Sequence, residues 1–236
     1  MKIILGILIW LSLCTSAIGQ TQMGEARTAE AQRLLDINAF SSDVRVSKLE
    51  LLENITEQFD GSPFLCKKWS EGKVIFKDGQ SVNYQMHYNV YAQQFWLKKD
   101  EKDIKMLKID GNVNKIQLQD KQFQLVGYKL DNEIKSSIME LMVDKEHRLF
   151  KQHNCKFIQG DQNVNSYSGP QKSKFSQSQK YFYAMGDEIH PLPTKKKAFF
   201  KCFGDDSQKI AAFCKKNKLK LNRDKDLVKI FNFYNQ

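Results

Sequence analysis

The clearest pattern in the chain is a strict alternation of apolar and polar residues over positions 82–90. The apolar set is Val82, Tyr84, Met86, Tyr88 and Val90, and the polar set between them is Asn83, Gln85, His87 and Asn89. Because successive side chains of a strand point to opposite faces, this alternation predicts a β-strand with an apolar face and a polar face.

The residues before this strand predict a hairpin over residues 73–90. Val74 to Phe76 forms a short apolar run, and Lys77-Asp78-Gly79 follows it directly. An Asp-Gly pair readily adopts the positive φ angles that a tight hairpin turn requires.

Seven further segments have the composition of strands, separated by short charged or amide-rich turns. They are residues 94–98, 104–109, 113–118, 123–128, 138–143, 149–158 and 180–185. Parallel neighbours would need crossover helices, which the sequence does not provide. We therefore predict a mainly β (α+β) fold over residues 44–192: an antiparallel meander that is either barrel-like or strongly curled.

Residues 159–179 interrupt the meander with a stretch of Gln, Ser, Asn and Gly. Almost none of its side chains would be buried, so we expect a long flexible loop between two strands. Such a loop can carry binding function, but an insertion without function is an equal alternative.

After residue 193 the apolar spacing becomes helical. Ala198 to Phe203 predicts a short helix that ends at Gly204, and Ile210 to Cys214 predicts a second. Leu227, Val228, Ile230, Phe231 and Tyr234 form the apolar stripe of a third. Helices this short need packing partners, so residues 193–236 should form a small helical unit docked on the sheet.

The first nineteen residues predict a secretory signal peptide. Lys2 precedes an apolar run from Ile3 to Leu13, and small residues end the segment before Gln20. The run is short for a transmembrane helix, so a permanent anchor is the weaker interpretation. Cys14 offers a lipidation alternative, which the bulky Leu13 before it disfavours. Residues 20–43 should be an N-terminal helical segment, with helix formers from Glu25 to Phe40.

Positive charge is concentrated at the end of the chain. The whole chain has a net charge of +10, and residues 195–236 alone contain twelve Lys or Arg residues and four Asp residues, a net charge of +8. This predicts an anion-binding surface formed by Lys195, Lys196, Lys197, Lys215, Lys216, Lys218, Lys220 and Arg223. Lysines that only keep a helical surface solvated are the alternative.

An exported protein can form disulfides. The mature chain contains Cys66, Cys155, Cys202 and Cys214, and the sequence does not determine their pairing. Cys202 and Cys214 flank a turn between two predicted helices, so this pair is the first to test as a disulfide. Buried thiols are the favoured alternative.

The sequence contains no common catalytic or metal-binding motif. HExxH, paired CxxC, EF-hand, GxSxG and phosphate-binding glycine motifs are all absent. His147, His153 and Cys155 share one strand face, but an ordinary strand explains this spacing. We therefore predict neither a metal nor a cofactor.

Five aromatic residues fall within thirteen positions: Tyr84, Tyr88, Tyr91, Phe95 and Trp96. Such rings can form a sugar- or peptide-binding face. Because Tyr84 and Tyr88 lie in the apolar row of their strand, we favour core packing.

Three segments together carry a resemblance to a group of bacterial proteins. They are GSPFLCKKWSEGKVIFKDG (residues 61–79), YNVY (88–91) and KKNKLKLNRDKDLVKIFNFYN (215–235). The chain resembles uncharacterised exported proteins of Bacteroidetes-type bacteria over residues 60–236. The resemblance implies a β-rich body, a short helical C-terminus and a bacterial envelope setting. It implies no activity and no site residues.

These observations favour an exported, non-catalytic binding or structural protein of the cell envelope. Its expected partner is an anionic envelope polymer or a membrane surface, contacted through the C-terminal lysines. Nucleic acid is an unlikely partner for an exported chain. The rival hypothesis is an envelope hydrolase with dispersed catalytic residues.

Overall fold

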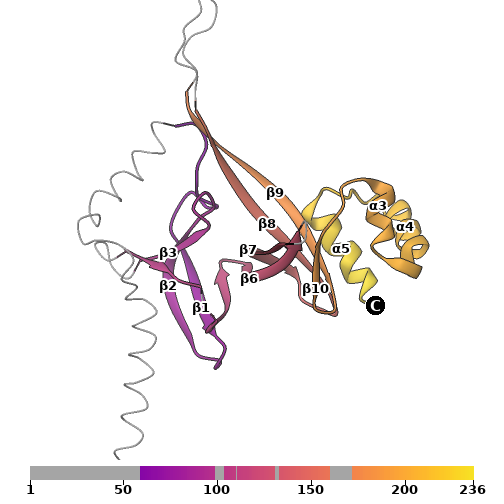
Figure 1. The fold of residues 1–236 in the computed structure, drawn as a ribbon, viewed down its shortest axis with the longest axis horizontal. Coiled ribbons are helices and arrows are strands. Elements are labelled where there is room, and N and C mark those ends of the chain that lie inside the picture. The colour runs from indigo at the N-terminus through magenta and orange to yellow at the C-terminus, as the bar shows by residue number, and fades with distance from the viewer. Residues whose placement is uncertain (1–58, 99–103, 110, 131–132, 160–171) are drawn as a thin grey trace, which may run out of the picture.

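The computed structural model describes residues 59–98, 104–109, 111–130, 133–159 and 172–236. The predicted signal peptide, Cys14 and the predicted helical segment over residues 20–43 lie outside the described residues. Within them, ten strands form one sheet, and short helices follow it (Figure 1). The strands are β1 (Ser70–Phe76), β2 (Ser81–Asn89), β3 (Gln94–Lys98), β4 (Ile104–Leu107), β5 (Val113–Leu118), β6 (Lys121–Leu130), β7 (Glu133–Val143), β8 (His147–Ile158), β9 (Lys174–Met185) and β10 (Glu188–Pro191). The helices are α3 (Lys196–Lys201), the 3-10 turn η2 (Gly204–Asp206), α4 (Ser207–Lys216) and α5 (Asp224–Tyr234).

The sheet is antiparallel throughout, and its strand order is β10-β9-β8-β7-β6-β5-β1-β2-β3-β4. It therefore consists of two meanders, β1 to β4 and β5 to β10, which are joined where β5 pairs with β1. The predicted antiparallel β fold is confirmed. The barrel alternative is wrong, because the sheet stays open with β4 and β10 at its edges.

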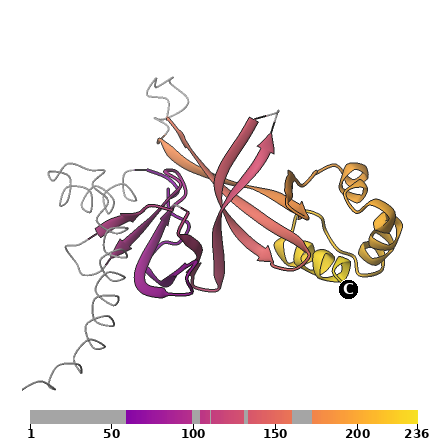
Figure 2. The ribbon, with the colours of Figure 1, turned by 60° about the horizontal axis from the view of Figure 1, so that its bottom comes forward.

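The second meander is strongly curled, as expected for a twisted antiparallel sheet. β10 comes close to β6 although the two strands do not pair. The rings of Tyr128 on β6 and Phe182 on β9 lie 4.8 Å apart inside this curl. Figure 2 shows the two meanders side by side, with the helices beyond β8 and β9.

The predicted hairpin over residues 73–90 is confirmed, but half of the polar row of β2 is not exposed. Val74 pairs with Val82, and Gly79 has the positive φ angle that the turn requires. Asn83 and Gln85 are exposed as expected, whereas His87 and Asn89 are buried. The cause is a preceding segment that covers the end of this face. Phe64 bridges to Asn89 and stacks on the His87 ring at 4.1 Å.

The predicted flexible loop over residues 159–179 is too long. β9 begins at Lys174, and Phe175 pairs with Phe157 in a continuous ladder with β8. The sequence KFSQSQ pairs through its main chain, so it forms a strand without a regular apolar row. Residues 160–171 lie outside the described part of the chain.

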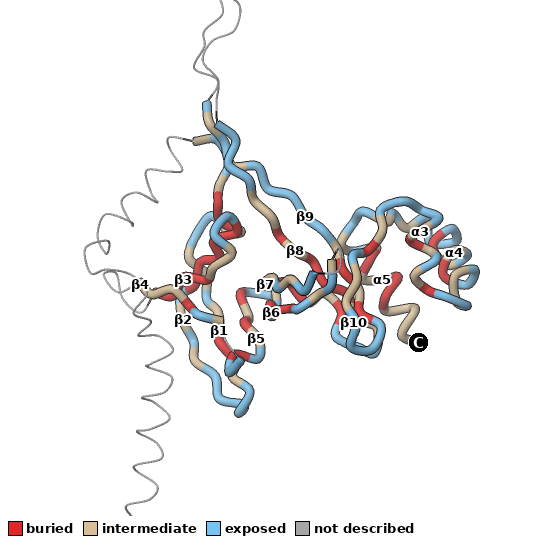
Figure 3. Tube along the Cα trace, viewed as in Figure 1, coloured by how far each residue is buried: buried red, intermediate tan, exposed pale blue. Residues whose placement is uncertain are grey.

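Three hydrophobic clusters occupy the two faces of the sheet (Figure 3). The first fills the space enclosed by β1 to β7, and includes Met86, Tyr88 and Phe95, each 0% exposed. The second lies between the helices and the sheet, around Leu149, Phe199 and Ile230. The third lies inside the curl of β6 to β10. Of the five rings for which core packing is predicted, Tyr88, Phe95 and Trp96 are buried, Tyr84 is partly buried and Tyr91 is 54% exposed.

Helix α5 is attached to strand β8 at both of its ends. At its first turn, Asp224 Oδ2 accepts a hydrogen bond from Lys151 Nζ at 2.6 Å. At its end, Asn235 accepts from the backbone N–H of His147 at 2.8 Å and donates to the His147 carbonyl at 3.0 Å. Eleven helical residues span about 16 Å, and four strand residues about 13 Å. The two lengths are similar, so the helix can lie along the strand. Because its start meets Lys151 and its end meets His147, it runs antiparallel to β8.

Candidate functional site

All of the cations in the C-terminal unit project into solvent. Lys195 precedes α3, Lys196 and Lys197 open it, and Lys215 and Lys216 close α4. The other three predicted residues follow α4: Lys218 and Lys220 lie in the connection to α5, and Arg223 directly precedes α5. All twelve Lys and Arg residues from position 195 onward are exposed. The predicted anion-binding residues are therefore accessible.

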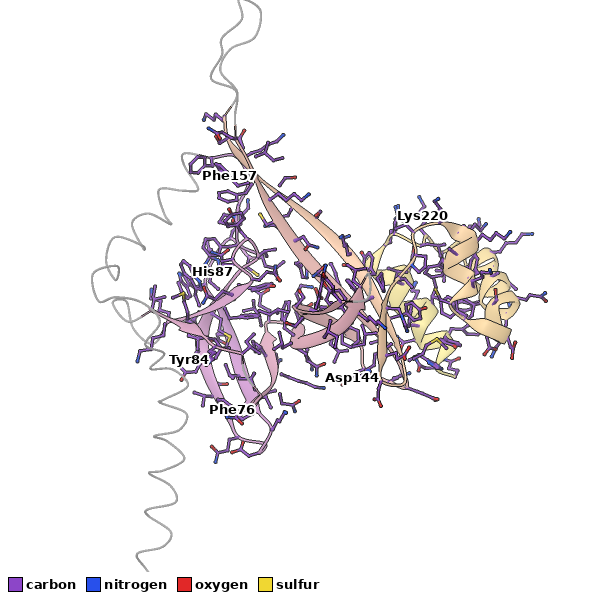
Figure 4. The ribbon with its side chains drawn as sticks, viewed as in Figure 1. Phe76, Tyr84, His87, Asp144, Phe157 and Lys220 are labelled. Carbon is purple, nitrogen blue, oxygen red and sulfur yellow. The ribbon has the colours of Figure 1, made fainter. Side chains whose placement is uncertain are left out.

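The fold brings Lys196 of the first basic run into electrostatic reach of Cys214, in the last turn of α4. Burial raises the pKa of the Cys214 thiol, while the charge of Lys196 opposes that increase and the charge of Asp226 adds to it. Cys214 thus lies within electrostatic reach of the first turns of both α3 and α5. Because the last turn of α4 carries Lys215 and Lys216, Lys196 of the first basic run lies near the start of the second. We call the surface that carries the eight predicted cations the basic junction; it comprises the start of α3, the end of α4 and the connection to α5, and Lys220 lies at the outer edge of the unit (Figure 4).

The carboxylates of the unit are mostly engaged by other groups, which leaves this charge uncompensated. Asp224 bonds Lys151 and Tyr181 of the sheet. Asp226 Oδ2 accepts from the backbone N–H of Lys220 at 3.0 Å. In the described part of the chain, Lys209 is the one cation of the unit with a carboxylate within 4.0 Å, Asp206 at 3.9 Å. The basic junction therefore has a net positive field.

A second charged cluster is buried in the sheet, where no sequence motif indicates it. Phe123, Glu140, Lys151 and Tyr181 face one another in register across β6, β7, β8 and β9. Paired residues of neighbouring strands share a face. This row therefore lies on one face of the sheet, with the first hydrophobic cluster on one side and the helical unit on the other.

Two hydrogen-bonded groups make up this cluster. Glu140 accepts from Lys121 Nζ at 2.8 Å and contacts His153 Nε2 at 2.7 Å. Asp224 accepts from Lys151 at 2.6 Å and from the Tyr181 hydroxyl at 2.5 Å. The side chains of Glu140 and Lys151 are each 8% exposed, whereas their partners Lys121 and Asp224 are 30% and 39% exposed.

The bonds of the cluster keep its carboxylates ionised. Burial of Glu140 favours its neutral form, but the hydrogen bonds from His153 and Lys121 outweigh burial and lower its pKa to about 2. Burial acts on Asp224 in the same direction, and the hydrogen bonds of Lys151 and Tyr181 lower its pKa below the ordinary value. Burial and the bond to Asp224 raise the pKa of Tyr181. A general acid needs a raised pKa, so these carboxylates serve as ion-pair anchors.

The four cysteines of the described residues are free thiols, so the predicted disulfide between Cys202 and Cys214 is not formed. Cys202 directly follows α3 and donates to the carbonyl of Ala198 at 3.4 Å. Cys214 lies on α4 and is buried in the cluster between the helices and the sheet.

The histidines of β8 have separate surroundings. His147 stacks on the Tyr234 ring at 4.1 Å, whereas His153 contacts Glu140. Six strand residues place them about 20 Å apart. Among the residues that the structure describes, no group of three His, Cys, Asp or Glu side chains is placed to hold a metal ion.

Comparisons with models of protein families, with curated proteins and with solved structures gave no match to this chain. No helix in the described residues is long and apolar enough to cross a bilayer. The basic junction and the buried cluster are therefore interpreted from their own geometry.

Proposed function

We propose that this chain is exported and acts as a non-catalytic binding protein of the cell envelope, with the basic junction as its contact surface for an anionic polymer. One observation carries the proposal. Twelve exposed cations lie on a unit whose four carboxylates leave them largely unpaired. An uncompensated positive surface attracts polyanions through the release of their counterions.

The position of three of these lysines supports the same conclusion. Lys195, Lys196 and Lys197 lie at the start of α3, and the first turn of that helix contains no acidic residue. The N-terminal end of a helix carries a partial positive charge, so cations there are unfavourable for helix stability. Stability alone would favour acidic residues at these positions, and an anionic partner would offset the unfavourable charge.

The attachment of the helical unit supports a binding role as well. Lys151, Asp224 and Tyr181 fix the first turn of α5 on the sheet, and Asn235 fixes its last turn. A rigid support keeps the exposed cations in fixed relative positions, which reduces the entropy lost on binding. The export signal and the envelope setting remain predictions from the sequence. The hydrolase alternative receives no specific support, because the two carboxylates with perturbed pKa values are bonded to side chains of the protein itself.

The test is a titration of the chain from Gln20 onward with fluorescently labelled heparin, at several salt concentrations. The test variant replaces Lys195, Lys196, Lys215 and Lys216 with Gln. The matched control replaces four exposed lysines of the sheet with Gln: Lys77, Lys108, Lys129 and Lys145. Circular dichroism confirms that both variants are folded.

We expect wild-type affinity to fall steeply with salt. In a plot of log affinity against log salt, each lost contact reduces the slope by about 0.7–0.9. The test variant should therefore lose both affinity and salt dependence, while the control should retain most of both. Equal losses in the two variants would show that only overall charge matters. Capture that is insensitive to salt would rule out an electrostatic contact altogether.

A further inference from the structure

The end of the β8–β9 hairpin carries a cluster of four aromatic rings from separate segments. Phe157 and Phe175 pair across the two strands, with ring centres 5.1 Å apart. Phe59 packs edge-on against both, at 5.4 Å and 6.0 Å. Tyr91, from the β2–β3 turn, lies 5.6 Å from Phe175. We call these four residues, together with Ile158, the aromatic tip.

The aromatic tip is apolar but not buried. Tyr91 is 54% exposed, Ile158 44% and Phe157 40%. Half of the large exposed hydrophobic residues in the described part of the chain lie here, the others being Leu125, Ile134 and Met185. Scattered single apolar residues are normal on a surface, but a cluster at one projecting end indicates an interaction site.

Exposed cations lie at the same end of the hairpin, where Lys156, Ile158 and Lys174 occupy the face opposite Phe157 and Phe175. Lys156 and Lys174 lie on the two strands, and Lys172 lies two residues before β9 begins. An exposed carboxylate accompanies them on Asp60, whose backbone pairs with β9. Among the described residues at this end, three cations against one acidic residue give a net positive charge beside the apolar rings. Its partner should offer both an apolar phase and negative charge.

The geometry of the hairpin places this surface far from the basic junction. The β8–β9 ladder continues in register from Ile158 and Lys174 to His147 and Met185, a span of about 36 Å. The helical unit docks near the His147 end, and the aromatic tip is at the opposite end, where Figure 4 labels Phe157. The two surfaces are thus independent.

We propose that the aromatic tip binds the surface of an anionic lipid bilayer. Aromatic side chains favour the membrane–water interface, because their rings are apolar while the region around them is hydrated. Lysine side chains extend toward the head groups, and each strengthens binding near an anionic surface. If the hairpin end meets the bilayer end-on, Phe157 and Tyr91 supply apolar contact on one face and Ile158 on the other, and Lys156, Lys172 and Lys174 supply the charge. Together with the basic junction, the molecule would bridge a bilayer and a polymer.

The first experiment is co-sedimentation of the chain from Gln20 onward with vesicles of phosphatidylcholine containing about 30% phosphatidylglycerol, an anionic fraction high enough to attract cationic side chains. The test variant is Ile158→Glu, because Ile158 makes none of the ring contacts and its replacement leaves the cluster packed. The matched control is Ile134→Glu, an isoleucine 89% exposed near the end of the β6–β7 hairpin. Loss of one apolar contact and gain of one negative charge should weaken the partition of Ile158→Glu at least about tenfold. The Ile134→Glu variant should bind like the wild type.

The second experiment locates the contact. Phe157→Trp keeps a large ring at the tip. Its emission is obtained as the difference from the unsubstituted chain from Gln20 onward, which contains Trp69 and Trp96. With vesicles, the added emission should shift to shorter wavelength and be quenched by lipids brominated in their acyl chains. Ile134→Trp should show neither change.

Three outcomes would overturn the proposal. The protein could fail to bind the vesicles, or the added emission of the Phe157→Trp variant could remain unquenched while binding occurs. If the emission stays unquenched and the four-lysine variant of the basic junction no longer binds the vesicles, the membrane contact belongs to the basic junction. Self-association without vesicles, removed by Ile158→Glu, would identify a second copy of the chain as the partner.

Discussion

The ion pairs of Glu140 should make the free energy of unfolding depend on pH in the acidic range. The carboxyl has an ordinary pKa of 4.5 in the unfolded chain and a pKa of about 2 in the folded protein. Between these values the unfolded state binds more protons, so stability falls as the pH falls. The contribution is complete above about pH 5.5 and is lost progressively as the pH falls through 4.5 toward 2.

The magnitude follows from this change in pKa. A decrease from 4.5 to about 2 corresponds to about 3 kcal/mol of stability at neutral pH. The Lys121 side chain is 30% exposed, so solvent screens part of that ion pair, and we expect about 2 kcal/mol. A single substitution, Glu140→Gln, removes the titrating group but keeps the shape of the side chain.

Urea unfolding at pH 7 and pH 3 measures this contribution. Glu140→Gln should be less stable than the wild type at pH 7, and the difference should narrow by more than about 1 kcal/mol at pH 3. Glu133→Gln is the control, because Glu133 forms an exposed ion pair with Lys135 at 3.3 Å. It should change stability little at either pH. A difference between Glu140→Gln and the wild type that stays constant across this range would refute the reasoning.

Two further substitutions test the packing of the sheet and the attachment of α5. A Cβ atom on Gly72 would lie 2.7 Å from the backbone oxygen of Gln117. Gly72→Ala should therefore lower the free energy of unfolding, measured in urea, by about 1–3 kcal/mol. Unchanged stability would mean that β1 and β5 are less closely packed. Asp224→Ala leaves the Lys151 ammonium buried and unpaired, which should cost about 2–3 kcal/mol. The double variant with Lys151→Met should recover part of that loss, and strictly additive effects would show that the two groups do not interact.

The sequence predicts the strands well where side chains alternate. The predicted bounds of β3 and β5 coincide with the structure, because apolar residues alternate or cluster between clear turns. The start of β9 could not be predicted in this way, because a strand of polar residues can pair through its backbone alone. The available signal is Phe175, an isolated aromatic residue in an amide-rich segment.

The sequence likewise predicts one part of the candidate site, the exposed lysines, and not the other, the buried charged cluster. The exposed lysines could be predicted, since charge is read directly from the chain, and the helical spacing places them outside. The buried cluster depends on which strands pair and on where α5 docks, and no local pattern determines either. One signal is present: Glu140 interrupts the apolar run from Ile138 to Val143 at an inward position. A charge at such a position requires a partner, but the sequence does not show that Lys121 and His153 provide it.

The strand order also has a consequence for how the chain folds. Within the described sheet, every strand pairs with a neighbour in sequence except at one seam, where Val74 of β1 meets Ile116 of β5, 42 positions away. Local hairpins close quickly, whereas distant segments must first overcome the entropy of a long loop. Each half can therefore collapse early during synthesis, and assembly of the complete sheet waits for this single long-range encounter. Substitutions at the seam should slow refolding more than equally destabilising ones within either half.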